Sequence, residues 1–281
     1  MTHRTTSGTL RVPRATIYYE VRGAGPVLLI IPGGPQDAGV FTDLAQRLAD
    51  RFTVVAYDPR GNSRSIVDGA PADQRLDVHG DDAARLIEAL GGGPADVFGT
   101  SGGAQIGLNL AARHPERVRT LVAHEPPAIM LLDDPAAALA ADQEIYDTYR
   151  REGVDAAMAA FMAMTGLADE PESADAPPEF APTPEDAATF ARVSGNFEYW
   201  LAHGIMPLSR YRPDIDALGA GQPRVVVGIG EQSTGHLIHD VGLAVAAKLG
   251  TDPVVFPGDH FGFGSHADTF AETLHRVLTG E

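Results

Sequence analysis

The chain has 281 residues, 44% of them hydrophobic and 21% charged, which is typical of a globular protein that buries a sizeable core. Its formal net charge of −17 argues against nucleic acid or an anionic membrane surface as a partner. It contains no cysteine, which excludes disulfides, thiolate metal sites and a cysteine nucleophile.

The N-terminal segment, residues 1–14, lacks the apolar run of a secretory signal peptide. No apolar stretch approaches the roughly 20 residues that a membrane-spanning helix needs. We therefore expect a cytoplasmic enzyme. The sequence leaves open whether it is a monomer or a homodimer.

The first elements alternate between strand and helix patterns. Two short strands, 9–12 and 16–21, precede a continuous apolar run at 27–31, which is typical of a strand buried on both faces of a parallel sheet. Apolar positions on one face predict a helix over 39–50, and the next strand covers 52–57.

A helix over 76–90 follows, and Gly91-Gly92-Gly93-Pro94 ends it. A short apolar strand then runs into Gly99-Thr100-Ser101-Gly102-Gly103, and an alanine- and leucine-rich helix continues to residue 113. This is the G-x-S-x-G pattern in the strand–turn–helix setting of a nucleophile elbow. The pattern predicts that Ser101 is held out of the sheet with its hydroxyl exposed to a substrate.

A strand at 118–123 completes the first series of strand–helix units, and these lengths predict a mostly parallel sheet with helices on both faces. Ligands bind at the carboxyl ends of the strands in such sheets. Four residues follow predicted strands and are expected at that edge: Gly34, Asp58, Ser101 and Glu125.

The alternation stops after residue 125 and resumes near residue 216. Between them lie helical patterns over 136–151, 154–165 and 184–204, with an acidic, proline-rich connection at 168–186. Strands at 224–229 and 253–256 and helices at 236–249 and 266–278 follow. We therefore predict a core built from 1–125 and 216–281, with a helical cap over 126–215.

The hydroxyl of Ser101 needs a general base, because it is neutral at pH 7. His260 is the best candidate among the ten histidines, because it follows the last predicted strand in a glycine-flanked loop. That position gives the chain order serine, acid, histidine expected of this architecture.

Two carboxylates are candidates for the acid that orients the histidine. Glu125 follows the strand after the elbow helix, and Pro126-Pro127 stiffen its backbone. Glu231 follows the next strand, in a flexible polar turn. Residue type and position favour Glu125 only slightly, so both stay open.

An oxyanion hole needs two backbone N–H donors. Gly102, directly after the serine, supplies one. The other comes from Gly33 or Gly34, because the flanking prolines have no N–H, and Gly34 is better placed after the turn. Residues 58–65 are expected to form an Asp–Arg network that braces the loops near the elbow.

Together these motifs resemble the α/β-hydrolase superfamily over nearly the whole chain. Within it, the sequence resembles the zearalenone lactonases in three stretches: residues 122–127, residues 257–261 with Ser265-His266, and residues 196–200. The resemblance implies an eight-stranded, mostly parallel sheet with the cap inserted after the sixth strand. It also implies Glu125 as the acid, Gly34 and Gly102 as oxyanion donors, and Trp200 as a substrate-binding residue.

We therefore expect a serine hydrolase that cleaves a small-molecule ester or lactone through Ser101, His260 and Glu125, without cofactor or metal. The same fold also supports carbon–carbon bond hydrolysis or perhydrolysis. A hydrolase-like ligand-binding protein with little turnover is a third reading, and an intact serine–histidine–acid set argues against it.

Overall fold

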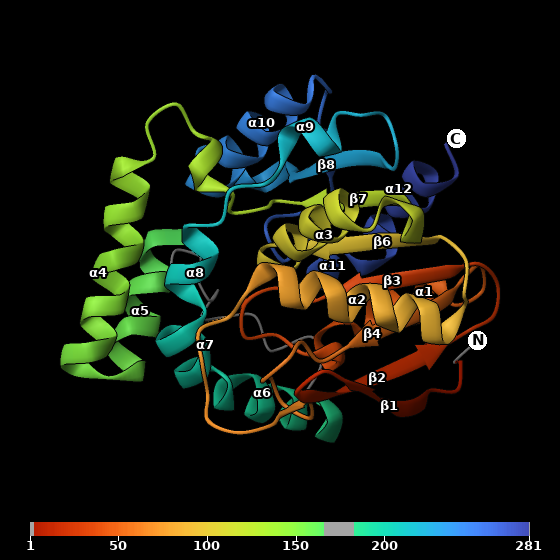
Figure 1. The fold of residues 1–281 in the computed structure, drawn as a ribbon, viewed down its shortest axis with the longest axis horizontal. Coiled ribbons are helices and arrows are strands. Elements are labelled where there is room, and N and C mark those ends of the chain that lie inside the picture. The colour runs from red at the N-terminus through yellow and green to blue at the C-terminus, as the bar shows by residue number, and fades with distance from the viewer. Residues whose placement is uncertain (1–2, 166–182, 281) are drawn as a thin grey trace, which may run out of the picture.

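The computed structural model describes residues 3–165 and 183–280, and one sheet organises them (Figure 1). Within this part of the chain the sheet has nine strands in the order β1-β2-β4-β3-β6-β7-β8-β9, with β5 paired to β2. The strands are β1 (Thr6–Val12), β2 (Ala15–Arg22), β3 (Val27–Ile31), β4 (Thr53–Tyr57), β5 (Ile66–Val67), β6 (Ala95–Thr100), β7 (Val118–His124), β8 (Arg224–Gly230) and β9 (Val254–Phe256).

The six strands β4, β3, β6, β7, β8 and β9 are parallel, and β1, β2 and β5 add an antiparallel edge. The predicted α/β-hydrolase architecture is confirmed. The sheet has one strand more than the eight expected, because Ile66–Val67 pairs with β2. Two residues are too few to show an alternating pattern, and Ile66 is exposed.

Helices cover both faces of the sheet because the central strands are apolar on both sides. In β3, Leu28 and Ile30 pack into one core cluster, and Leu29 and Ile31 pack into the other. The first face carries α1 (Thr42–Leu48), α11 (Gly262–Ser265) and α12 (Ala267–Thr279). The second carries α2 (Leu76–Leu90), α3 (Gly102–Arg113) and α10 (Leu237–Leu249).

The described part of the segment between β7 and β8 contains helices joined by short loops, and no strand. It contains α4 (Ala136–Glu152), α5 (Val154–Thr165), α6 (Pro184–Gly195), α7 (Phe197–His203), α8 (Ile205–Ser209) and α9 (Ile215–Leu218). Figure 1 shows α4 and α5 standing beyond one end of the sheet. The division into core and cap at 126–215 stays a prediction. Residues 166–182, which include most of the acidic connection, lie outside the described residues.

The helix predicted over 184–204 is two helices, α6 and α7, which meet at Asn196. The Asn196 side chain donates to the Pro35 carbonyl oxygen at 2.8 Å and accepts from the Ser63 amide at 2.7 Å. The break therefore lies where the segment binds two loops of the core. Helical periodicity could not reveal this, because the partners are distant in sequence.

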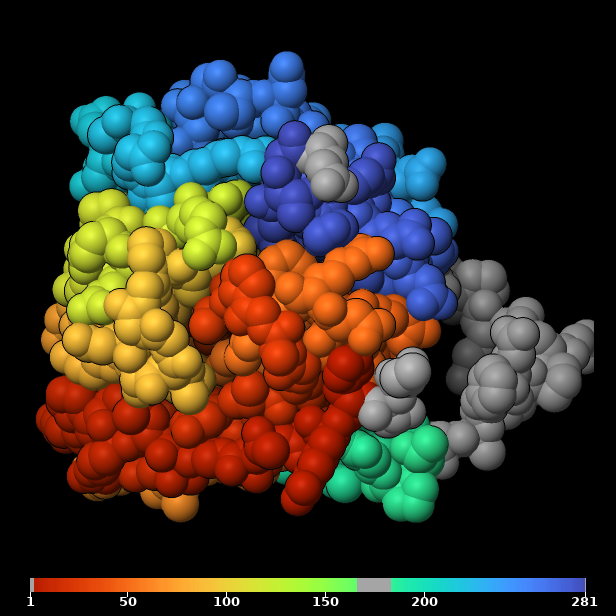
Figure 2. All heavy atoms as spheres, turned by 90° about the vertical axis from the view of Figure 1, so that its right-hand side faces the viewer, coloured from red at the N-terminus to blue at the C-terminus, as the bar shows by residue number. Residues whose placement is uncertain are grey.

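The two edges of the sheet lie on opposite sides of the molecule. Figure 2 shows the face away from α4 and α5, where the N-terminal strands (red) occupy the bottom and C-terminal segments (blue) lie near the top. In the described part of the chain, no helix combines the length and the apolar character needed to cross a bilayer.

Candidate active site

Ser101 occupies a sharp turn between β6 and α3. Its backbone has a φ of 54° and a ψ of −129°, a conformation that costs a non-glycine residue on the order of 1–3 kcal/mol. The turn requires glycine on both sides. A Cβ on Gly99 would lie 2.5 Å from the carbonyl oxygen of Gly103, and one on Gly103 would lie 2.1 Å from that of Ile31. The Ser101 amide donates to the His124 carbonyl oxygen at 2.9 Å, which anchors the turn to β7.

Two backbone amides lie together beside this serine. A Cβ on Gly102 would lie 3.1 Å from the Gly34 nitrogen. The Gly33 amide is occupied, because it donates to Gln36 Oε1 at 3.1 Å. Within the described ranges, neither the Gly34 nor the Gly102 amide has an acceptor elsewhere in the chain. The geometry therefore favours Gly34 over Gly33 as the partner of Gly102 in an oxyanion hole.

His260 and Glu125, 135 residues apart, form a hydrogen bond of 2.7 Å between Nδ1 and Oε2. A carboxylate only accepts hydrogen bonds, so Nδ1 carries a proton and Nε2 is left for another group. The other carboxylate oxygen accepts the Gly230 amide at 2.8 Å. Glu125 is fully buried and has a φ of 45°, which places its side chain between these two donors.

Burial raises the pKa of Glu125, but its hydrogen bonds and the neighbouring histidines lower that pKa by more. The His260 bond, the positive charges that His124 and His260 carry when protonated, and the Gly230 amide lower the pKa of Glu125 to about 2. This carboxylate is therefore ionised at neutral pH and can hold the imidazole of His260 in one tautomer.

His124 is a packing residue. Its ring lies 5.3–5.6 Å from the rings of Phe256 and Phe270, and burial lowers its pKa to about 4. Its Nδ1 lies 3.1 Å from Thr100 Oγ1. The neutral ring of His124 is fully buried and packs behind that of His260, with ring centroids 6.3 Å apart.

A cavity of about 170 Å³ joins these groups to the helical segment. Five residues singled out from the sequence line it: Gly34, Ser101, Gly102, Trp200 and His260. Trp200 is 5% exposed and packs edge-on against Phe161, with ring centroids 4.9 Å apart. Its indole N–H has no acceptor among the described residues and lies 3.5 Å from a Cβ placed on Gly34. Trp200 thus contributes to the cavity wall, while its indole N–H is enclosed beside the Gly34 loop.

The loop that carries Gly34 is fixed from two sides. From the core, Asn62 Nδ2 donates to the carbonyl oxygens of Gly34 and Gln36, each at 3.0 Å. From the helical segment, Asn196 donates to the carbonyl oxygen of Pro35. The position of the Gly34 amide therefore depends on both parts of the molecule.

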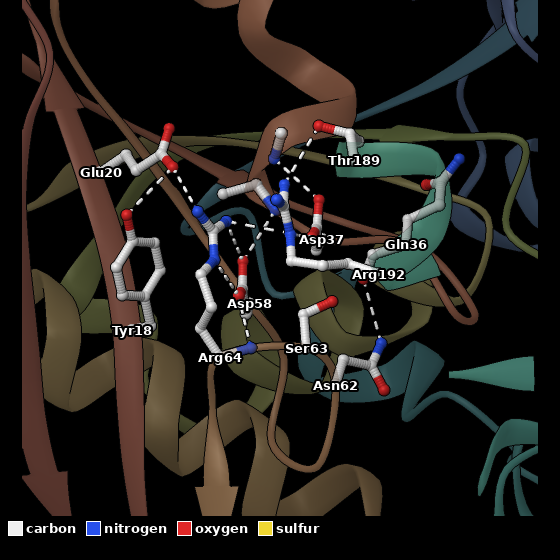
Figure 3. Close-up of polar contacts among 12 residues, drawn as sticks. Tyr18, Glu20, Gln36, Asp37, Asp58, Asn62, Ser63, Arg64, Thr189 and Arg192 are labelled. Carbon is white, nitrogen blue, oxygen red and sulfur yellow. Dashed lines mark hydrogen bonds and ion pairs between the residues drawn. The ribbon is translucent and has the colours of Figure 1, made fainter. Parts of the chain in front are cut away.

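Ion pairs extend this support (Figure 3). Buried Asp37, at the end of the loop, accepts Nε of Arg192 from α6 at 2.6 Å. Buried Asp58 accepts the Ala38 amide at 3.0 Å and the Nε of Arg64 at 2.8 Å. The Asp–Arg network expected in residues 58–65 is thus an Asp58–Arg64 pair. Arg60, in contrast, pairs with Asp82 on α2.

The structure does not bring Glu231 to the site, because it is exposed in a short turn after β8 and makes no bond to His260. It adds Asp142 and Ser209, which line the cavity but were missed in the sequence. Helical spacing could have predicted that Asp142 faces inward, because it lies four residues after Ala138 and three before Ile145, and both of these are buried. Residues 3–165 and 183–280 contain no group of three or more His, Asp or Glu side chains suited to a metal ion.

Comparison with known proteins identifies the family to which this fold belongs. Residues 26–169 match the alpha/beta hydrolase fold family. An uncharacterized hydrolase, YraK of Bacillus subtilis, is 34% identical over 98% of this chain and 97% of its own. The zearalenone hydrolase of Bionectria ochroleuca is 28% identical over 95% of this chain and 96% of its own.

Among solved structures, a thermophilic esterase from Thermogutta terrifontis has the same fold, with a TM-score of 0.74 at 20% identity. The match covers 99% of this chain and 98% of the esterase. Family match, full-length relatives and shared architecture lead to one conclusion: the chain belongs to the alpha/beta hydrolase fold family and is a hydrolase.

Proposed function

We propose that this protein is a serine hydrolase of carboxylic esters or lactones, with Ser101 as nucleophile, His260 as general base and Glu125 as the orienting acid. The observation that carries the proposal is the 2.7 Å bond between His260 and ionised Glu125 beside the cavity that contains Ser101. The bond holds Nδ1 on Glu125, so that in the neutral imidazole it is Nε2 that can accept the serine proton.

In the proposed reaction, His260 Nε2 takes the proton of Ser101 as the hydroxyl oxygen attacks the substrate carbonyl. The Gly34 and Gly102 amides stabilise the oxyanion, and losing one such donor typically costs about 2.7–4 kcal/mol. His260 then returns the proton to the leaving alkoxide, which leaves an acyl group on Ser101. Water, deprotonated by the same imidazole, hydrolyses the acyl-enzyme and restores the serine.

The size and lining of the cavity favour a compact, apolar molecule as the first test substrate. Its volume of about 170 Å³ is close to that of engineered cavities, of about 150 Å³, that bind benzene. The likeness to a named zearalenone hydrolase supports lactones as well as open-chain esters. We therefore propose single-ring aryl esters and small lactones as initial substrates, with a resorcylic macrolactone as the larger comparison.

The decisive variant is Ser101→Ala, with Ser265→Ala, a serine in an exposed segment, as the matched control. Removal of a catalytic serine lowers kcat by about 10⁶ in a serine hydrolase. We expect Ser101→Ala to reduce hydrolysis of 4-nitrophenyl acetate to near background and Ser265→Ala to leave it unchanged. Retained turnover in folded Ser101→Ala would rule out this mechanism. A folded wild-type protein that binds esters without turnover would instead indicate a ligand-binding protein.

A further inference from the structure

The cavity holds a carboxylate that the proposed reaction does not use. Asp142 projects from α4, and its Oδ2 lies 2.6 Å from Ser209 Oγ on α8. The other acidic residue in the lining, Asp259, has a local partner, because its Oδ1 accepts the Phe261 amide at 2.8 Å. Asp142 is therefore the carboxylate that needs an explanation.

The hydrogen bonds around Ser209 leave Asp142 incompletely satisfied. Ser209 Oγ also lies 2.7 Å from the Ile205 carbonyl oxygen, but a hydroxyl has only one hydrogen to share between two acceptors. The second carboxylate oxygen, Oδ1, has no donor among the described residues. Burial raises the pKa of Asp142, so an additional donor from a bound molecule would be especially favourable here.

The rest of the lining offers this carboxylate no permanently charged cation. The lining includes apolar Ile129, Phe161, Leu208 and Val241, and contains no lysine or arginine among the residues described; its two imidazoles are His236 and His260. A negatively charged group in this cavity would lose its hydration, find no guanidinium or ammonium group and lie near Asp142. The formal net charge of −17 adds to that repulsion at longer range.

We propose that Asp142 and Ser209 form a polar subsite that accepts a hydrogen-bond donor of the substrate, a hydroxyl or an ammonium group, and excludes anionic substrates. The inference rests on the proposed function, because it places this donor on the ester or lactone whose carbonyl meets Ser101. In this proposal the cavity has two ends: the reaction takes place beside Gly34 and Gly102, and the donor group of the substrate binds beside α4 and α8.

Equilibrium binding tests the subsite without requiring turnover. The ligands are acetophenones, which mimic an ester but are not hydrolysed, with methyl, hydroxymethyl, aminomethyl or carboxylate groups at the meta and para positions. In the wild-type protein, we expect the better-placed hydroxymethyl or aminomethyl ligand to bind about tenfold more tightly than its methyl analogue. The carboxylate should bind at least about tenfold more weakly.

Variants assign the effect to Asp142. Asp142→Leu should abolish the advantage of both donors, whereas Asp142→Asn should weaken the aminomethyl ligand more than the hydroxymethyl one, because an amide oxygen still accepts. Glu144→Gln, an exposed carboxylate on the same helix, is the control and should match the wild type. Equal binding of all four groups to the wild-type protein would overturn the subsite, even if no Asp142 variant folds.

Hydrolysis of the corresponding methyl benzoates separates the two proposals. Donor-selective binding without Ser101-dependent hydrolysis would support the subsite and refute the proposed function. Hydrolysis of the unsubstituted ester with no preference among the four ligands would support the proposed function and refute the subsite.

Discussion

Glu125 and Ser101 are both held in left-handed backbone conformations, with φ values of 45° and 54°. Such conformations cost on the order of 1–3 kcal/mol each and persist only where the surroundings enforce them. The Glu125 amide donates to the Gly228 carbonyl oxygen at 2.9 Å, which ties its backbone to β8. The strained conformation of Glu125 brings its carboxylate against His260. We therefore attribute this strain to the chemistry of the site.

The acid assignment is tested by comparing Glu125→Gln with Glu231→Gln. A glutamine at position 125 cannot stabilise the imidazolium and favours the wrong tautomer, so kcat should fall by about 10⁴. Glu231 is exposed and makes no bond to His260, so its variant should stay within about twofold of the wild type. Steady-state hydrolysis of an aryl ester measures both. The reverse order would assign the role to Glu231.

At the scale of elements, α6 supports the loop that carries the proposed oxyanion donor. Arg192 of α6 pairs with Asp37, which is fully buried, and Asn196, directly after the helix, donates to the Pro35 carbonyl oxygen. The guanidinium is partly exposed, so the pair is not completely removed from solvent. Docking of this helix and the position of the Gly34 amide are therefore linked through the same loop.

Arg192→Met should destabilise the protein because it removes the closer of the two guanidinium groups that pair with the buried Asp37 carboxylate, leaving only Arg64 at 3.9 Å. We expect a loss of on the order of 2 kcal/mol in urea unfolding, together with a lower kcat for an aryl ester. Arg151→Met, which removes an exposed pair with Glu144, should cost less than about 1 kcal/mol and leave kcat unchanged. Similar losses of unfolding free energy in both variants would show that the Arg192–Asp37 pair contributes no more than an exposed ion pair.

Local sequence patterns predicted the elements but not the contacts between them. Apolar runs identified the central strands, and the G-x-S-x-G pattern placed Ser101, because both signals lie within a few residues. Pairing of His260 with Glu125 rather than Glu231 depends on how β7, β8 and the last loop meet. Asp142 and Ser209 are 67 residues apart in the sequence, so no local periodicity could predict their contact.

At the scale of the whole molecule, two histidine rings among the described residues are buried and neutral at pH 7. Burial lowers the pKa of His79 and of His124 to about 4, compared with the ordinary value of 6.5. Below pH 6.5 the unfolded chain takes up protons that the folded chain accepts only near pH 4. Their contribution to stability is therefore complete above about pH 6.5 and is lost as the pH falls towards 4.

If both rings behave in this way, we expect each to lower the free energy of unfolding by about 2–3 kcal/mol between pH 6.5 and 4. His79→Gln should reduce this slope, because the replacement does not titrate. Urea unfolding midpoints across this range measure the effect. An identical slope in His79→Gln would show that His79 does not contribute to it.

Covalent labelling by a fluorophosphonate, followed by peptide mass spectrometry, tests most directly whether Ser101 is an activated nucleophile. We predict one adduct per chain, located on Ser101, and none in Ser101→Ala. Labelling in His260→Ala should be at least about 100-fold slower, because general-base assistance of that size is lost. An adduct on another residue, or an unlabelled Ser101 in a protein that hydrolyses esters, would contradict the assignment.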